Sequence, residues 1–117
     1  MSPKIDTSLA TIQQAVRKFR DARKWRQFHS PKNLSMSIAI EAAELMEHFQ
    51  WLTTEQATTL AKDDAKARTA ITEELADVLI YCFSLADMIE CDVAEIIFDK
   101  LAKNDEKYPV ESYQGRF

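Results

Sequence analysis

Apolar residues recur every three or four positions near the start of the chain, which is the spacing of one face of an α-helix. The positions in this repeat are Ile5, Leu9, Ile12, Val16 and Phe19. The polar residues between them are expected to face outward, among them Gln13, Arg17, Lys18 and Arg20. The repeat ends at Arg23, so the sequence predicts a connecting loop over residues 23–29, which carries two aromatic residues and a histidine.

A second helix is predicted from Pro31 to Leu52. Its start is well defined, because Ser30 can cap the first turn and proline is favoured at the first helical position. Two apolar stripes run along this helix, and a polar stripe lies between them at steps of four, three and four residues. The polar positions are Ser37, Glu41, Glu44 and His48. Acidic side chains are therefore expected near the middle of a helix that is apolar on either side of them.

A small, polar segment follows the second helix. Thr53 and Gln56 have the spacing of a capping box and are expected to open a short helical turn. The composition of residues 58–66 is typical of a surface connection.

Two more long helices complete the pattern. The third is expected to begin near Asp63 or Asp64 and to continue to about Ile89. The fourth should begin after the capping residue Asp92 and end at Pro109, since proline cannot continue a helix. The tail beyond it has no period. Four helices joined by short links predict an all-α four-helix bundle.

The composition agrees with a helical protein. The chain of 117 residues has one glycine and three prolines, which argues against an all-β fold and against a glycine-rich phosphate loop. Its length suffices for one domain, spanning residues 1–117. The net charge of -4 disfavours a binder of nucleic-acid polymers. No apolar run approaches bilayer length and the first residues lack the pattern of a secretory signal, so a cytoplasmic protein without membrane contacts is expected.

The two cysteines, Cys82 and Cys91, are expected to stay reduced. Along a continuous helix they would lie roughly 13 Å apart, which is too far for a disulfide. The sequence contains no CxxC motif. Cys82 is expected in the core.

Two pairs of acids are the strongest candidates for chemistry. Glu41 and Glu44 lie three positions apart in the second helix, and Glu74 and Asp77 lie three apart in the third. If the two helices pack side by side, four carboxylates meet at one depth, where they repel unless they are protonated or bind cations. Oxygen ligands favour a hard cation, Mg²⁺ or Mn²⁺, whose remaining positions often hold substrate phosphates. The alternative is an ordinary solvated face. A di-iron bundle would require Glu-x-x-His motifs, and the sequence has none.

Several motifs together resemble a known family. They are WRQFHSPKNL at residues 25–34, EAAEL at 41–45, FQW at 49–51, EELADVLIY at 73–81 and KLAKNDEKYP at 100–109. This set resembles the all-α nucleoside triphosphate pyrophosphohydrolases, the MazG-like superfamily, and within it the branch that contains dCTP pyrophosphatase. The first helix, residues 53–70 and the tail lie outside the resemblance.

The resemblance implies a role for each matching residue. The Mg²⁺ ligands are implied to be Glu41, Glu44, Glu74 and Asp77. The base and sugar pocket is implied to be lined by Trp25, His29, Asn33 and Trp51. The triphosphate is implied to be reached by Lys100, Asn104 and Tyr108. The implied enzyme hydrolyses a nucleoside triphosphate, dCTP or a related dNTP, to the monophosphate and pyrophosphate. It is implied to act as a homodimer or homotetramer whose pockets are partly built by a neighbouring chain.

No arrangement of a serine, cysteine or histidine nucleophile is present, so a direct attack by water is expected. Glu44 or Glu47 is the candidate to orient or deprotonate that water. Trp25 and Trp51 can stack on a base, although core packing is the commoner role of tryptophan. Two other function classes stay open, which are a non-catalytic oligomeric interaction module and a nucleotide-binding protein without turnover.

Overall fold

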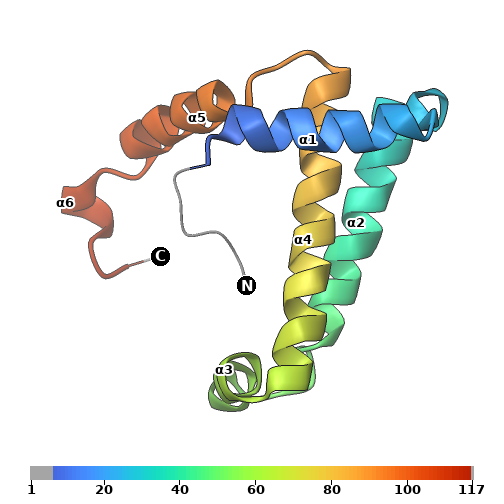
Figure 1. Cartoon of the computed structure of the whole chain (residues 1–117). Coiled ribbons are helices and arrows are strands. Elements are labelled where there is room, and N and C mark those ends of the chain that lie inside the picture. Colours follow the sequence, from blue (N-terminus) through green and yellow to red (C-terminus); the bar gives the residue numbers. More distant parts are fainter. Residues whose placement is uncertain (1–6, 117) are drawn as a thin grey trace.

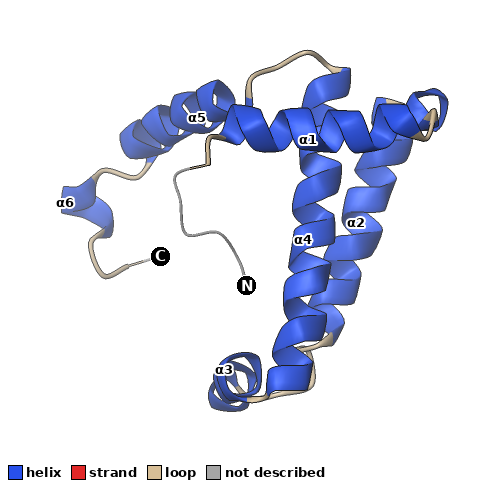
Figure 2. Cartoon of the chain, viewed as in Figure 1, coloured by secondary structure: helices blue, strands red, loops and turns tan. Residues whose placement is uncertain are grey.

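The computed structural model describes residues 7–116, and all regular elements in this range are helical (Figures 1 and 2). They are α1 (Leu9–Ala22), the 3-10 helix η1 (Trp25–Phe28), α2 (Pro31–Glu47), α3 (Thr54–Asp63), α4 (Ala65–Met88), α5 (Val93–Lys107) and the single turn α6 (Val110–Tyr113). The predicted all-α fold is confirmed. Ile5, the first residue of the apolar repeat, lies outside the described residues. None of the described helices is long and apolar enough to cross a membrane.

Side-chain caps fix where the long helices begin. Ser8 caps α1, and Ser30 caps α2 with Pro31 in the first turn. Asp64 caps α4 and Asp92 caps α5, in each case by accepting a hydrogen bond from a backbone N–H group of the first turn. Such caps satisfy N–H groups that have no partner within the helix. The predicted starts of the second, third and fourth helices are therefore confirmed.

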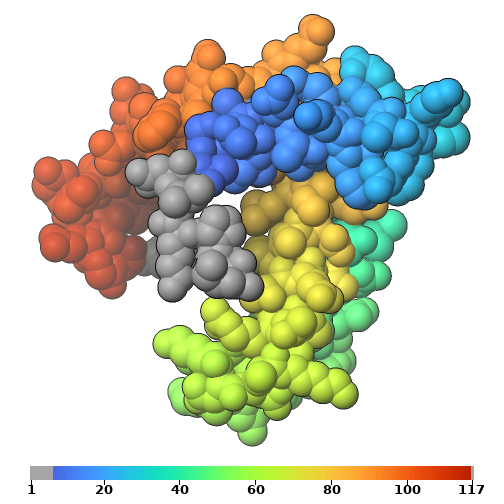
Figure 3. Space-filling model, viewed as in Figure 1, coloured from blue at the N-terminus to red at the C-terminus, as the bar shows by residue number. Residues whose placement is uncertain are grey.

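The frame of the molecule is the antiparallel pair α2 and α4, which make the most extensive contacts of any two elements (Figure 1). Helix α3 joins them at one end, and α1 crosses them near the other. Helix α5 contacts α1 and extends away from the α2–α4 pair. The space-filling view shows side chains of α4 at the surface between α1 and α3 (Figure 3).

Several predicted boundaries are wrong. Helix α2 ends at Glu47 rather than Leu52, because the N–H groups of Phe49 and Gln50 both bond to the carbonyl of Met46 and the chain turns. Most of the segment 58–66, predicted as a surface connection, belongs to α3 and to the start of α4.

Helix α3 continues beyond a single turn because it has its own apolar face. Its predicted capping box is confirmed, with Thr53 and Gln56 bonded reciprocally at 3.1 and 2.9 Å. Leu60 and Ala61 are half-buried, and the helix packs on α4. The loop predicted over residues 23–29 likewise contains the helix η1, and the tail contains α6.

The burial of two residues contradicts the sequence pattern. Arg20, expected to face outward, is only 1% exposed. Cys82, expected in the core, is exposed, and it lines an apolar groove between α1, α4 and α5. Both cysteines are free thiols, as expected. Arg20 does lie beside the apolar stripe of α1, but a long charged side chain can turn inward when a buried acid pairs with it.

That acid is Asp87 on α4. Arg20 Nη1 donates to Asp87 Oδ2 at 2.6 Å, and Arg17 Nε donates to Asp87 Oδ1 at 2.7 Å. These two bonds tie α1 to α4 close to the cavity described below.

Candidate metal centre and adjoining cavity

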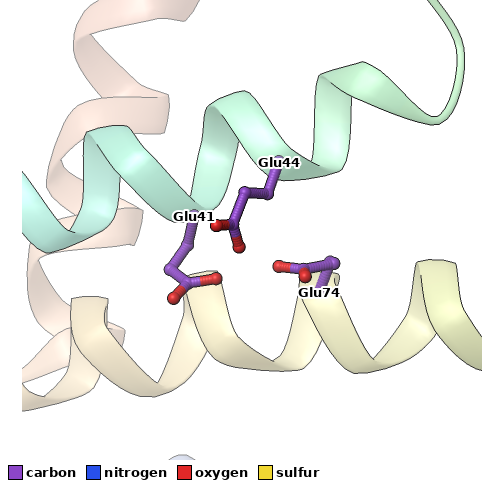
Figure 4. A group of neighbouring side chains, drawn as sticks. All are labelled: Glu41, Glu44 and Glu74. Atoms are coloured by element: carbon purple, nitrogen blue, oxygen red, sulfur yellow. The ribbon is translucent and has the colours of Figure 1, made fainter.

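Three of the four predicted acids meet between α2 and α4. Glu41 and Glu44 are one helical turn apart on α2, and Glu74 faces them from α4 (Figure 4). One carboxylate oxygen from each lies within 4.8 Å of the others. Helices α2 and α4 pack side by side, which is the condition under which their acids meet, and three of the four acids lie together.

The cluster is short of positive charge. The Oε2 atoms of Glu41 and Glu74 are buried and have no hydrogen-bond partner. The pKa of Glu41 is raised to about 7. The causes are a hydrogen bond from protonated Glu41 to Glu74, the loss of solvent around the carboxyl group, and the nearby Glu44. Carboxyl groups in this state hold either a proton or a cation.

The donor set fits a divalent cation. Mg²⁺ binds oxygen at about 2.0–2.1 Å, so two oxygens on opposite sides of one ion lie about 4 Å apart. The separations within the cluster approach this span. An ion would give the two orphaned Oε2 atoms the partner that the chain does not provide.

Asp77 lies beside the cluster rather than within it. It lines a cavity of about 250 Å³, and Glu41 lines the same cavity. Asp77 is three positions after Glu74 on α4 and so projects from the same side of the helix one turn further on. The fourth predicted acid therefore connects the acid cluster to a cavity.

Aromatic side chains form part of the cavity wall. Trp25 packs edge-on against Phe19, with ring centroids 5.7 Å apart. His29 lies between Trp25 and Tyr81, with centroid distances of 6.2 and 6.5 Å. Two residues predicted for the base pocket, Trp25 and His29, are thus brought to one cavity with two of the predicted acids.

Polar groups in the cavity are poorly satisfied. Burial lowers the pKa of His29, and the positive charge of Arg20 lowers it further. The Nδ1 atom of His29 and the Nη2 atom of Arg20 are both buried without a hydrogen-bond partner. Arg20 lines this cavity, although the sequence pattern gave it no role. The only sequence signal for a role of Arg20 is its position just before residues 23–29, a polar segment that carries two aromatic residues and a histidine.

The remaining predicted site residues lie apart from the cavity. Asn33 is exposed in the first turn of α2, and its side-chain amide donates to the carbonyl of Phe28, which holds η1 against α2. Trp51 is 87% exposed beyond the end of α2. Glu47 is the last residue of α2 and is exposed.

The predicted phosphate-binding residues are all on α5. Lys100 and Asn104 follow one another at a step of four, and Tyr108 caps the end of the helix. Helix α5 points away from the acid cluster (Figure 1). Within one chain, the fold does not bring these three residues to the acids.

Comparison with known proteins gives consistent matches. The model of the MazG-like family matches residues 36–116, which include all four predicted acids. dCTP pyrophosphatase 1 of Mus musculus is 36% identical over 110 residues, covering 94% of this chain and 64% of that protein. The protein of the same name from Homo sapiens is 35% identical over 104 residues, covering 89% of this chain and 61% of that protein. The chain thus spans less than two thirds of the length of these curated relatives.

A solved structure has the same fold. It is a pyrophosphatase from Archaeoglobus fulgidus DSM 4304, with a TM-score of 0.78 and 36% sequence identity. The match covers 93% of this chain and 99% of that one.

Proposed function

The chain belongs to the MazG-like family, and on that premise we propose that it is a nucleoside triphosphate pyrophosphohydrolase. It cleaves a nucleoside triphosphate to the monophosphate and pyrophosphate. The observation that carries this proposal is the convergence of Glu41, Glu44 and Glu74 beside an aromatic cavity. The names of the relatives support the reaction class, and those named dCTP pyrophosphatase 1 make dCTP the first substrate to try.

The acids would hold Mg²⁺, with Mn²⁺ as a substitute. Glu41, Glu44 and Glu74 supply the oxygen ligands, and Asp77 lies one turn away, where it can complete the set. When bound, the metal neutralises charge on the phosphate oxygens and polarises the phosphorus.

The chain's own residues perform the other tasks. Trp25 offers a flat aromatic face for the base, and stacking of this kind contributes about 1–3 kcal/mol per base. His29 and Asn33 fix the loop and the start of α2 beside it. Glu44 or Glu47 orients or deprotonates the attacking water, since both project from the last turns of α2.

A neighbouring copy of the chain completes the site in this proposal. Lys100, Asn104 and Tyr108 lie on α5 or at its end, and this helix extends away from the α2–α4 pair (Figure 1). Trp51 is exposed beyond the end of α2. A homodimer or homotetramer can bring these residues to the acids of a second copy. We place this oligomer in the cytoplasm, in keeping with a nucleotide substrate.

The proposal is tested with a panel of nucleoside triphosphates. Purified protein with Mg²⁺ should release monophosphate and pyrophosphate from dCTP or a related dNTP, and chelation of the metal should stop the reaction. Product analysis by ion-exchange chromatography distinguishes pyrophosphate from stepwise release of phosphate. No turnover of any nucleotide at high enzyme concentration would favour an interaction module or a non-catalytic nucleotide-binding protein instead.

A pair of neighbouring variants localises the chemistry. Glu74→Gln should lower kcat/KM by at least about 100-fold, because loss of a ligand should cost no less than the 10–100-fold typical of groups that merely support ligands. Glu73→Gln removes an adjacent, exposed carboxylate and should leave kcat/KM within about twofold. Equal losses in the two variants would show that Glu74 has no special role.

A further inference from the structure

Arg20 combines burial with an unused hydrogen-bond donor. The residue is 1% exposed. Its Nε donates to Asp21 at 2.9 Å and its Nη1 donates to Asp87 at 2.6 Å. Its Nη2 is buried and has no partner. An unsatisfied buried donor costs about 1–3 kcal/mol, and more for a charged group, so such a group calls for an explanation.

The surroundings of Arg20 suggest a ligand rather than a packing fault. Arg20 lines the same cavity as Trp25, His29 and Asp77. The volume of about 250 Å³ lies below the roughly 300–1,000 Å³ of pockets for drug-sized ligands. The cavity therefore suits one flat ring, with the acids at its edge left for the phosphates.

We propose that Arg20 reads the base of the substrate, by donating a hydrogen bond from Nη2 to a carbonyl oxygen of a pyrimidine. The inference rests on the proposed function and adds to it a residue that selects the base. Every pyrimidine base of the common nucleotides has a carbonyl at C2, whereas adenine has none. A buried, charged donor placed to meet a carbonyl oxygen discriminates strongly between a base with an oxygen at that position and a base without one.

The two aspartates make Arg20 suitable for this task. Asp21 bonds Nε and Asp87 bonds Nη1, so two of the three guanidinium nitrogens are held, and the planar group is fixed before the base arrives. Arg17 provides the contrast. It also pairs with Asp87, but its side chain is 45% exposed and it does not line this cavity. Clamping α1 to α4 therefore does not require a buried arginine at position 20.

The test combines a variant with an atomic change in the substrate. Wild type, Arg20→Met and the matched control Arg17→Met are assayed with dCTP and with 2-thio-dCTP, in which sulfur replaces the only carbonyl oxygen of cytosine. In wild type and in Arg17→Met the sulfur substitution should lower kcat/KM about 10–100-fold. In Arg20→Met it should lower kcat/KM less than about threefold, because the donor is already absent.

A structural role for Arg20 gives a different result. The sulfur substitution would then have the same effect in Arg20→Met as in wild type, and this outcome overturns the inference. If Arg20→Met does not fold, Arg20→Lys keeps the charge beside Asp87 and removes Nη2, and the same comparison applies to it. If neither variant folds, equal kcat/KM values for the two substrates with wild type overturn the inference.

Binding measurements separate this inference from the proposed function. Calorimetry with dCMP and 2-thio-dCMP in the absence of metal should show about 10–100-fold weaker binding of the thio compound to wild type and no such difference in Arg20→Met. A protein that hydrolyses no nucleotide but shows this pattern would refute the proposed function and keep the role of Arg20. A protein that hydrolyses dATP in preference to all pyrimidine nucleotides would keep the function and refute the role of Arg20.

Discussion

The carboxyl group of Glu41 keeps its proton to a higher pH than usual because of its surroundings. Hydrogen bonding to Glu74, desolvation and Glu44 raise its pKa from 4.5 to about 7. Between these values the folded state binds more protons than the unfolded state, so the metal-free protein must lose stability as the pH rises through this range. Because the site is only half-buried and solvent screens its charges, the loss should amount to about 1 kcal/mol.

The variant Glu74→Gln isolates this effect from other titrating groups. It removes the charge that opposes ionisation of Glu41, so stability should fall less between pH 5 and pH 8 than in wild type, although desolvation and Glu44 still raise the pKa of Glu41. Urea unfolding in the presence of a chelator measures the difference, and Glu73→Gln should behave as wild type. Parallel pH profiles for wild type and Glu74→Gln would show that the two carboxylates do not share a proton.

At the scale of single residues, the sequence predicts the acids well and Arg20 poorly. Glu41, Glu44 and Glu74 could be found because a helical period fixes which residues share a face, and two apolar helices of this length must pack together. Arg20 lies beside the apolar stripe of α1, and its partner Asp87 is 67 positions away. No local pattern encodes a pairing over that distance.

At the scale of helices, starts were more predictable than ends. The caps at Ser30 and Asp92 are local signals, and each occupies its predicted position. Helix α4 likewise begins after Asp64, where the start of the third helix is expected near Asp63 or Asp64. The end of α2 at Glu47 was missed because apolar residues continue beyond it. They continue as a turn, since Thr53 requires an extended backbone to cap α3. The apolar spacing of α2 does not show where α3 must begin, so the spacing alone cannot predict where α2 ends.

The attachment of α1 to α4 depends on Asp87. Burial disfavours the charge of Asp87, but hydrogen bonds from Arg20 and Arg17 outweigh this and lower its pKa. Asp87→Asn should destabilise the protein by about 3 kcal/mol at pH 7, because it deprives a buried guanidinium of a counter-charge. Urea unfolding followed by circular dichroism measures the change.

Asp21→Asn is the matched control for Asp87→Asn. Asp21 also bonds Arg20, but its side chain is 49% exposed, so its loss should destabilise the protein far less than the loss of Asp87. The stabilisation from Asp87 should be present above the ordinary pKa of an aspartate, near 3.8, and be lost as the pH falls below it. Equal stabilities of wild type and Asp87→Asn would mean that apolar contacts alone hold α1 in place.

At the scale of the whole molecule, one chain exposes more surface than a compact monomer of its size. It exposes 9450 Å², whereas a folded monomer of 13.4 kDa is expected to expose about 6,500 Å². Its radius of gyration is 17.1 Å, against about 13 Å for a compact chain of this length. Among the described residues, only Leu34, Ile71 and Ala86 form a fully buried apolar core. The excess surface is of the size that obligate oligomers bury.

Ile97→Glu tests whether a second copy covers this surface. Ile97 is 46% exposed on α5 and lines the apolar groove between α1, α4 and α5. Wild type should be a dimer or tetramer by light scattering, with a Tm that rises with protein concentration. The variant should dissociate and lose activity together, because the substrate contacts on α5 would no longer reach the acids of another chain. The control Lys18→Glu changes an exposed residue of α1 and should alter neither property. A wild-type monomer with full activity would contradict both the oligomer and the shared site, and would require α5 to fold back onto the acids of its own chain.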